Sequence, residues 1–462
     1  MKSKLIVKNF GPIESATLNL RNVNVLIGPQ ASGKSTLAKL YTICKSPVMY
    51  HELEGGKFSS SFYKIKETDE NFDSVSDLSL IKFIASLEHF SIGDFLINDT
   101  EIEFDCPTHK VSIIKGKIAF EDKISITNLL TFYKNEDILN VKKEFNKLIR
   151  KSDRFHFSYR FNIFYERVYK KDRNKETIGL KFREFNENFK KNDEINLNEV
   201  ENLIDVARIF KSEIFNNNAI YIPAERTIIN LIKQASFSFQ KAKVPLPSHL
   251  LDYATIYENA TDKVKEFDLG FLKDNTFYKN VNGIDRIFFA KNKSIKLTES
   301  ASGFQSVVPM ILPILNEKNT DSSKEHYSFV IEEPETNLFP KAQYELLKFL
   351  EKDRNDDFDK IDKGIIHTYT THSPFILSSF NNMLYAFKKG NNSVSKIKSE
   401  ICKILEECNW INPDQFSAYQ IEDGKSKSIM DRKTGLIKEN VIDYVSEDII
   451  DDFRKIALAS ID

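Results

Sequence analysis

The fold of this chain is decided by residues 28–36, which read Gly-Pro-Gln-Ala-Ser-Gly-Lys-Ser-Thr. A short apolar run at 23–27 precedes this loop, and a helical pattern at 35–44 follows it. The pattern G-x-x-x-x-G-K-S between a strand and a helix predicts a loop whose backbone N–H groups surround a phosphate. We expect Lys34 to reach the outer phosphates of a nucleotide and the Ser35 hydroxyl to bind Mg²⁺. The alternative, a chance match in a glycine turn, is disfavoured by the flanking strand and helix.

Two adjacent carboxylates follow another apolar run. Residues 327–331, Tyr-Ser-Phe-Val-Ile, predict a buried strand, and Glu332 and Glu333 come directly after it. Ligands of open α/β sheets bind at the carboxyl ends of the strands. We expect Glu332 to hold Mg²⁺ through water and Glu333 to orient or deprotonate an attacking water. A solvated charge pair is the alternative, and the phosphate loop makes it the weaker one.

Two further segments place polar groups at the starts of predicted helices. Residues 300–306, Ser-Ala-Ser-Gly-Phe-Gln-Ser, open a helix, where Ser302 and the N–H groups around Gly303 can bind an anion or simply cap the helix. Residues 370–374, Thr-Thr-His-Ser-Pro, follow a predicted strand. A lone histidine is more often structural, but this order of strand, Thr-His-Ser-Pro and helix favours a role for His372 at a γ-phosphate or the attacking water.

Length and composition are those of an ordinary soluble protein. The 462 residues suffice for two or three domains, and a formal net charge of −1 predicts no polyanionic partner from the global balance. Four cysteines without C-x-x-C spacing favour a reducing cytoplasm. The N-terminus has a charged strand pattern unlike a signal peptide, and no apolar run reaches the length of about 18 residues that a membrane span needs.

Strand and helix patterns alternate along the chain, which indicates an α/β fold. We predict a domain part at 1–130, an inserted helical arm at 131–214 and a second domain part at 215–462. Strand patterns occur at 5–20 (with a Gly11-Pro12 turn), 101–127, 219–223, 286–290, 294–297, 327–331 and 365–370, and a hairpin pattern at 418–430. Helix patterns occur at 249–273, 303–315, 342–350 and in an acidic stretch near 443–452.

The predicted arm contains a basic and aromatic stretch. Residues 141–191 hold sixteen Lys or Arg against seven Asp or Glu, with Phe and Tyr interleaved. Such a segment can contact nucleic acid through phosphate pairing and base stacking. It can equally pack on itself or on a protein, since Phe182, Phe185 and Phe189 have helical spacing. Both interpretations stay open, with packing slightly favoured.

The order of these segments resembles the ABC-type ATPase heads of the SMC, RecF and overcoming-lysogeny-defect (OLD) group. Residues 9–13, Asn-Phe-Gly-Pro-Ile, look like the N-terminal strand motif of those heads, and 332–340 look like their Walker B and D-loop run. Residues 221–226, Tyr-Ile-Pro-Ala-Glu-Arg, are similar to a strand motif of OLD-like bacterial defence ATPases. Within that group, the chain most resembles the ATPase subunits of Septu, PARIS and retron-associated anti-phage systems.

The resemblance implies an ABC-type P-loop head with a mixed central sheet, flanking helices and an antiparallel β subdomain. It also implies that two copies clamp two ATP molecules with Mg²⁺. Glu333 would be the catalytic carboxylate, His372 the switch, and Glu335 and Asn337 part of the D-loop; Ser35 and Glu332 would bind the metal. The implied ATP contacts are Gly28, Gln30, Ala31, Ser32, Gly33, Lys34, Ser35 and Thr36 of one copy and Ser302, Gly303 and Gln305 of the other.

Some positions depart from the family pattern. Gln30 stands where asparagine is usual, and Ala301 and Phe304 differ from the signature of ABC transporters. A Q-loop glutamine cannot be placed before the arm, and Glu225 or Gln234 is the substitute. These departures argue against the transporter branch more than against ATP binding.

About 88 residues follow Pro374, without the patterns of a Toprim or HNH nuclease. Any effector nuclease would therefore act in trans. Together with this absence, the resemblance implies a cytoplasmic, homodimeric or higher homo-oligomeric ATPase, slow and regulatory, that controls a separate effector, a nuclease, in anti-phage defence. A DNA-repair or chromosome-maintenance ATPase of the SMC/RecF type is the alternative. A transporter ATPase is disfavoured, and we expect no membrane partner.

Overall fold

A computed structural model describes residues 3–45, 83–106, 109–115, 117–122, 219–233, 246–289, 293–319, 328–355, 365–391 and 395–438. The chain divides into two compact units: Met1–Cys106, Lys110–Phe120 and Asn217–Asp462 form the first, and Pro107–His109 and Glu121–Asn216 the second. The first unit contains all the motifs that predict nucleotide binding. The predicted arm, its basic stretch at 141–191 and the acidic stretch near 443–452 lie outside the described residues.

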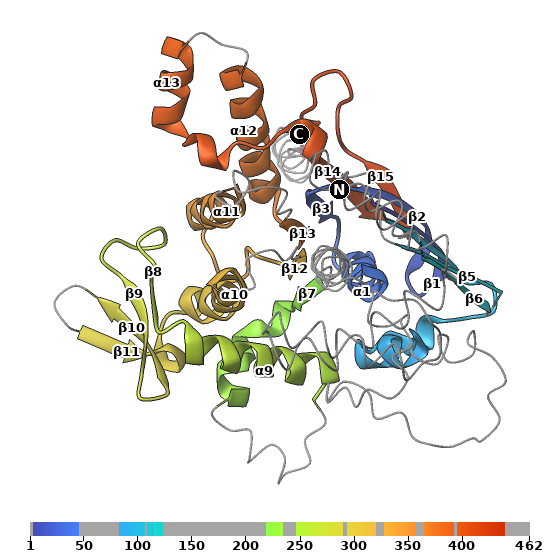
Figure 1. Cartoon of the computed structure of the whole chain (residues 1–462), viewed down its shortest axis with the longest axis horizontal. Coiled ribbons are helices and arrows are strands. Elements are labelled where there is room, and N and C mark those ends of the chain that lie inside the picture. Colours follow the sequence, from blue (N-terminus) through green and yellow to red (C-terminus); the bar gives the residue numbers. More distant parts are fainter. Residues whose placement is uncertain are drawn as a thin grey trace, which may run out of the picture. The chain divides into compact units, whose positions relative to one another are not determined.

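One large mixed sheet organises the first unit (Figure 1). Among the described residues it contains eleven strands in the order β6-β5-β4-β1-β2-β15-β14-β3-β13-β12-β7. Their bounds are β1 Ser3–Phe10, β2 Ile13–Leu20, β3 Val23–Ile27, β4 Glu101–Asp105, β5 His109–Ile114, β6 Lys117–Asp122, β7 Ala219–Ile222, β12 Ser328–Glu332, β13 Ile366–Thr371, β14 Phe416–Glu422 and β15 Lys425–Ser428.

The sheet has an antiparallel half and a parallel half. Strands β5, β4, β1 and β2 pair antiparallel, whereas β14, β3, β13, β12 and β7 run parallel. The β14–β15 hairpin, predicted around Asp423-Gly424, joins the halves because β15 also pairs with β2. The predicted α/β fold with a mixed central sheet is therefore confirmed. The antiparallel region that we predicted as a subdomain is an extension of this sheet.

Helices cover the parallel half on both faces, and the alternation of strand residues decides which core each side chain enters. Val25 and Phe329 enter one core with helices α10 (Ser302–Asn319), α11 (Pro340–Asn355) and α12 (Pro374–Asn391). Leu26 and Val330 enter the other with α1 (Lys34–Lys45). The helix after the phosphate loop and the helix that Ser302 opens thus lie on opposite faces of the sheet (Figure 1).

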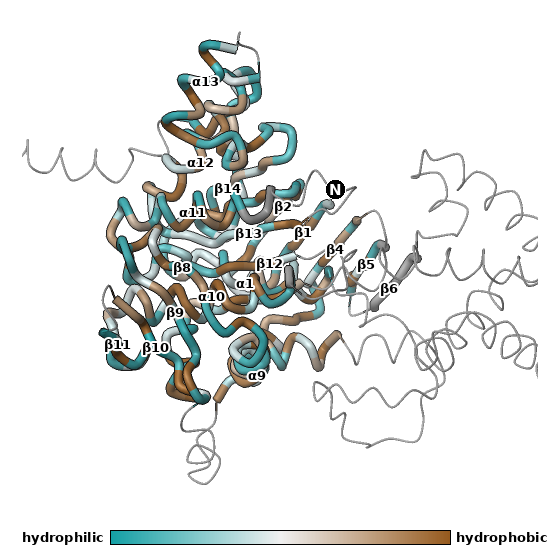
Figure 2. Tube along the Cα trace, turned by 60° about the vertical axis from the view of Figure 1, so that its left-hand side comes forward, coloured by the Kyte–Doolittle hydropathy of each residue, from teal (hydrophilic) through white to brown (hydrophobic). Residues whose placement is uncertain are grey.

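Both cores are made of fully buried aliphatic and aromatic side chains, and Figure 2 shows hydrophobic stretches along strands such as β1 and β12. Each such side chain contributes roughly 1.5–3 kcal/mol when it is removed from water. Within the described part of the chain, no helix is both long enough and apolar enough to span a bilayer.

A second, antiparallel sheet of order β11-β10-β9-β8 precedes α10. The helix predicted at 249–273 is wrong beyond Lys263: α9 spans Ser248–Lys263, and Val264 then adopts an extended backbone. The sequence does contain a signal for this antiparallel sheet, which is the pair Asn282-Gly283. Both residues have positive φ angles, 52° and 80°, and they form the hairpin turn between β9 and β10. The strands are β8 Glu266–Asp268, β9 Phe277–Val281, β10 Ile284–Phe289 and β11 Lys293–Lys296.

Helix α10 continues through Pro309 and Pro313, as predicted. Proline lacks an N–H group, so Pro313 cannot donate to the carbonyl of Pro309 one turn earlier. The Tyr253 hydroxyl of α9 donates to that carbonyl at 2.6 Å. A tertiary hydrogen bond therefore replaces the missing helical one, and it joins the two helices.

Candidate active site

Three neighbouring strands of the parallel half end at one edge of the sheet. Ile27 of β3 pairs with Thr371 of β13, and Thr370 pairs with Glu332 of β12. The next residues along the chain, Gly28, His372 and Glu333, therefore lie at the same edge. The strand register brings together three segments that are remote in the sequence, as we predicted from their positions after strands.

The phosphate loop closes around the Lys34 ammonium. Its Nζ donates to the carbonyls of Gly28 (2.9 Å) and Pro29 (2.7 Å) and lies 3.4 Å from the Ser32 hydroxyl. Burial lowers the pKa of Lys34, while the charges of Glu333, Glu335 and Glu332 oppose that shift. The lysine is thus held beside the carboxylates at the end of β12.

Two glycines of the loop have no room for a side chain. A Cβ atom at Gly28 would lie 2.0 Å from the Ile421 carbonyl oxygen of β14. At Gly33, where φ is +96°, a Cβ would lie 2.4 Å from Ile13 Cδ1. Glycine is needed at both positions because neighbouring backbone and core atoms press against the loop.

Glu332 has the properties of a metal-binding carboxylate. It is 4% exposed, and among the described residues its Oε1 atom has no hydrogen-bond partner. Burial raises the pKa of Glu332, and an interaction with the Ser35 hydroxyl opposes the shift. Within the described residues no group of three His, Cys, Asp or Glu side chains could hold a metal. Mg²⁺ keeps several waters and binds through one or two protein groups plus phosphates, so Ser35 and Glu332 fit this ion.

Glu333 and His372 form a pair that is open to solvent. His372 Nε2 lies 3.1 Å from Glu333 Oε1, and the two side chains are 32% and 34% exposed. The hydrogen bond from His372 is the largest cause that lowers the pKa of Glu333, and the Thr336 hydroxyl adds to it. Glu333 is therefore ionised at neutral pH, as a general base must be.

The backbone of Glu333 is strained, with φ at +42°. Its N–H donates to the Thr370 carbonyl (2.9 Å), and its carbonyl accepts from Thr336 N (3.0 Å) and Arg226 Nη2 (2.7 Å). A left-handed conformation costs a non-glycine residue about 1–3 kcal/mol and persists where surrounding bonds fix it. These contacts together fix the orientation of one carboxylate.

Glu335 holds the histidine loop within the same chain. Its Oε1 accepts from the Thr371 hydroxyl and from the His372 backbone N–H, both at 2.7 Å. The Ser373 hydroxyl donates to Gln343 Oε1 of α11 at 2.7 Å, which fixes the next residue of that loop. Sequence reasoning assigned Glu335 a D-loop role and missed Gln343, because only the folded chain shows these contacts.

The loop at 300–306, which by the family resemblance is the predicted signature loop, starts α10 and lies next to the predicted D-loop residues Asn337 and Leu338 of its own chain. Ser302 is exposed, and a Cβ at Gly303 would lie 3.2 Å from Leu338 and 3.3 Å from the Asn337 carbonyl. Gln305 donates to the carbonyls of Ser300 (2.7 Å) and Thr298 (3.3 Å), so its amide braces the loop. The predicted nucleotide contacts of Ser302, Gly303 and Gln305 stay predictions.

The remaining predicted nucleotide-binding residues lie in the phosphate loop or at the start of α1. Gln30, Ala31 and Ser35 are exposed at the loop and Thr36 is buried in α1. Glu225, one substitute for a Q-loop residue, is exposed, and its charge raises the pKa of Glu332. Gln234, the other, lies outside the described residues.

Arg226 was missed as a site residue. It is 0% exposed and donates to the backbone carbonyls of Glu332 (2.6 Å) and Glu333. Its segment was noted only as a family resemblance, and a single arginine after a strand carries no chemical signal of its own.

A phosphate loop, a buried acidic group for Mg²⁺ and an ionised glutamate at adjacent strand ends define the class of P-loop nucleotide-binding proteins. The family model described as AAA ATPase domain matches residues 1–377, and the chain belongs to that family. No curated protein matches the chain in a sequence comparison.

Similar solved structures include three heads of SMC proteins. The Smc head domain with an extended coiled coil, bound to the C-terminal domain of ScpA, from Pyrococcus furiosus has 10% identity and a TM-score of 0.34 over 93% of this chain and 95% of that one. The SMC head domain from Thermotoga maritima has 9% identity and a TM-score of 0.35, over 93% and 98%. An SmcHead bound to the C-winged helix domain of ScpA has 8% identity and a TM-score of 0.36, over 93% and 97%. Such TM-scores and identities carry no functional assignment.

Proposed function

We propose that this chain binds ATP with Mg²⁺ at residues 28–36 and hydrolyses it, with Glu333 as the general base. The observation that carries the proposal is the Glu333–His372 pair, at 3.1 Å, at the ends of β12 and β13, the two strands next in order to β3 and its phosphate loop. A loop that only stored a nucleotide would need no ionised, oriented carboxylate beside it.

The residues have separate tasks. Lys34 and the loop N–H groups bind the β- and γ-phosphates, and Ser35 and Glu332 hold the metal. Bound Mg²⁺ neutralises charge that develops on the phosphates. Glu333 accepts a proton from a water molecule. The oxygen of that water bonds to the γ-phosphorus, and the bond between the γ-phosphorus and the ADP oxygen breaks. His372 orients Glu333 from the side of β13.

The proposed site is shared between two copies of the chain. Ser302 is exposed at the start of α10, and α10 covers the sheet face opposite α1. This placement supports a signature loop that faces the nucleotide of a partner copy. ATP binding would then close a homodimer, or a higher homo-oligomer, in which each site is completed in trans.

The finer role that we propose is control of a separate effector nuclease, of Toprim or HNH type, in cytoplasmic anti-phage defence. It is supported by the likeness of residues 221–226 to the OLD-like group. The second candidate is DNA repair or chromosome maintenance of the SMC/RecF type, in which the sixteen basic residues of 141–191 would contact nucleic acid, one of the two interpretations left open for that stretch. Capture of partners from the native host by pull-down with mass spectrometry separates the two, since a nuclease supports the first and DNA-maintenance proteins the second.

Two substitutions test the proposed chemistry. We expect Lys34→Ala to lose ATP binding, and Glu333→Gln to bind ATP normally, lose about 100-fold or more in kcat and accumulate an ATP-bound dimer. Matched controls are Lys398→Ala and Glu345→Gln, whose side chains make surface ion pairs away from the site. Turnover at the parent rate in Glu333→Gln would remove the assignment of the base.

A further inference from the structure

Arg226 has an unusual set of partners for a buried charge. It is 0% exposed, and within the described structure its hydrogen bonds all go to backbone carbonyls. Nη1 donates to Pro223 (3.2 Å) and Glu332 (2.6 Å), Nη2 donates to Glu333 (2.7 Å), and Nε donates to Ser306 of α10 (3.0 Å).

Burial of a guanidinium without a hydrogen-bonded carboxylate is costly, and neutral carbonyls offset only part of that cost. A neutral side chain would fill the space without this penalty. The planar guanidinium offers something else, which is a rigid fork that binds several acceptors in fixed directions. Three of the four acceptors, the carbonyls of Glu332, Glu333 and Ser306, belong to segments that take part in the proposed reaction.

One acceptor belongs to the general base. Glu333 has a φ angle of +42°, and Arg226 holds its carbonyl while the Thr370 carbonyl holds its N–H. A second acceptor, the carbonyl of Ser306, lies four residues after Ser302, which is about one turn into α10. One side chain therefore connects the peptide of Glu333 with the first turn of the signature helix.

We propose that Arg226 is a positioning residue that joins the Glu333 peptide to the start of α10, so that base and signature loop move as one body. The inference rests on the proposed function. When the nucleotide of a partner docks on Ser302 and Gly303, the connection orients Glu333 for the nucleotide of its own chain. The two sites of a dimer are thereby coupled through a bond within each subunit.

The test compares Arg226→Lys and Arg226→Met with the unmodified chain. Lysine keeps the charge but has one nitrogen in place of the three that bond these four carbonyls, and methionine keeps only the apolar stem. We expect kcat to fall roughly 10-fold in Arg226→Lys and about 100-fold in Arg226→Met. KM and the affinity for a fluorescent ATP analogue should stay within about 2-fold, because the phosphate loop is untouched.

The matched controls are Arg286→Lys and Arg286→Met. Arg286 also donates to backbone and side-chain oxygens, but of Ser294 in the small sheet. We expect unchanged kcat in both controls. Thermal unfolding of every variant identifies those that are folded, and Arg226→Lys decides the question if Arg226→Met does not fold.

A double-mutant cycle tests whether Arg226 acts through Glu333. In a Glu333→Gln background, Arg226→Lys should cause no further loss of single-turnover hydrolysis. Three outcomes would each overturn the inference without touching the proposed function. The first is a further loss in the Glu333→Gln background as large as the loss that Arg226→Lys causes in the unmodified chain. The others are an equal fall of ATP affinity and kcat in Arg226→Lys, and an unchanged kcat in folded Arg226→Lys. Absence of hydrolysis in the unmodified chain would contradict the proposed function as well.

Discussion

His249, the second residue of α9, shows how single side chains set the pH range of this fold. It is 7% exposed, its ring stacks on Phe90 with centroids 5.7 Å apart, and its Nδ1 has no hydrogen-bond partner within the described residues. Burial, followed by the charge of Lys39, lowers the pKa of His249 to about 4. The imidazole is therefore neutral in the folded chain and protonates more readily when the chain unfolds.

The sign of the pH effect follows from that lowered pKa. Protonation of His249 favours the unfolded state. The contribution of the neutral His249 to the free energy of unfolding is therefore fully present above the ordinary pKa of 6.5, and it is lost as the pH drops from there toward 4. The loss at pH 5 should be about 2 kcal/mol. We expect His249→Phe, which preserves the stacking on Phe90, to reduce this loss, as measured by urea unfolding at pH 7 and pH 5. An identical loss in the variant would show that other groups cause it.

The residues that could be predicted were those whose chemistry depends on local sequence. Lys34 is recognisable from its loop, and Glu333 and His372 from the strands that precede them. Arg226 and Gln343 could not be found in this way, because their partners are carbonyls and hydroxyls brought close only by the sheet. The strained φ of Glu333 is also invisible in a sequence.

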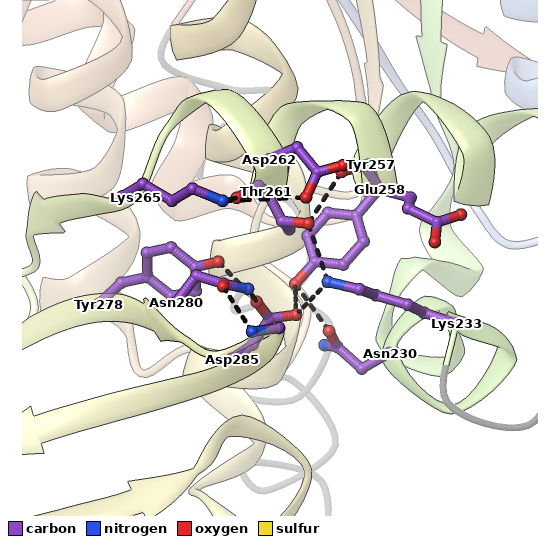
Figure 3. A network of polar contacts seen from close by, with 11 residues as sticks. Asn230, Lys233, Tyr257, Glu258, Thr261, Asp262, Lys265, Tyr278, Asn280 and Asp285 are labelled. Atoms are coloured by element: carbon purple, nitrogen blue, oxygen red, sulfur yellow. Dashed lines mark hydrogen bonds and ion pairs between the residues drawn. The ribbon is translucent and has the colours of Figure 1, made fainter.

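At the scale of elements, a buried polar network joins the small sheet to the segment that carries Arg226. Figure 3 shows Asp285 of β10 at its centre, between α9 and the residues after the segment Ala224–Ile228. Its carboxylate accepts from Lys233 (3.1 Å), Tyr257 (2.9 Å), Tyr278 (2.7 Å) and Asn280 (2.7 Å). The network therefore holds Asn230 and Lys233, a few residues after Arg226.

We expect Asp285→Ala to destabilise the chain by about 3–5 kcal/mol, because it leaves the Lys233 ammonium buried without its carboxylate. Glu266→Ala is the matched control, since it breaks the exposed Lys279–Glu266 pair and should cost at most about 1 kcal/mol. Chemical denaturation measures both. Equal, small losses in the two variants would show that the network does not hold the small sheet in place.

Elements were predicted well where periodicity and flanking signals agreed. The strand at 23–27 has the predicted bounds, and α10 was expected despite its prolines. The helix predicted to reach 273 failed because its apolar residues after Lys263 belong to a sheet, where Phe267 pairs with Tyr278. Short strands that alternate only over three residues give no usable period.

At the scale of the whole molecule, the proposed shared site makes a prediction for mixtures of variants. Ser302→Arg should stop hydrolysis without weakening ATP binding to the monomer, because it changes only the surface that faces a partner's nucleotide. Mixed with Lys34→Ala, it should regain activity, since a mixed dimer has one intact loop opposite one intact signature. Steady-state turnover measures the gain, with each variant alone as control, and normal turnover in Ser302→Arg alone would contradict the shared site.

The contact between Gly28 and Ile421 has a consequence for biosynthesis. β3 lies in the sheet between β13 and β14, and a hydrogen bond from Ser417 to Asn24 spans 393 positions of the chain. The ribosome therefore makes the phosphate loop long before β14, the strand that backs it. A chain that ends before β14 therefore lacks one wall of the loop, so we expect such a fragment to bind nucleotide more weakly than the chain with β14.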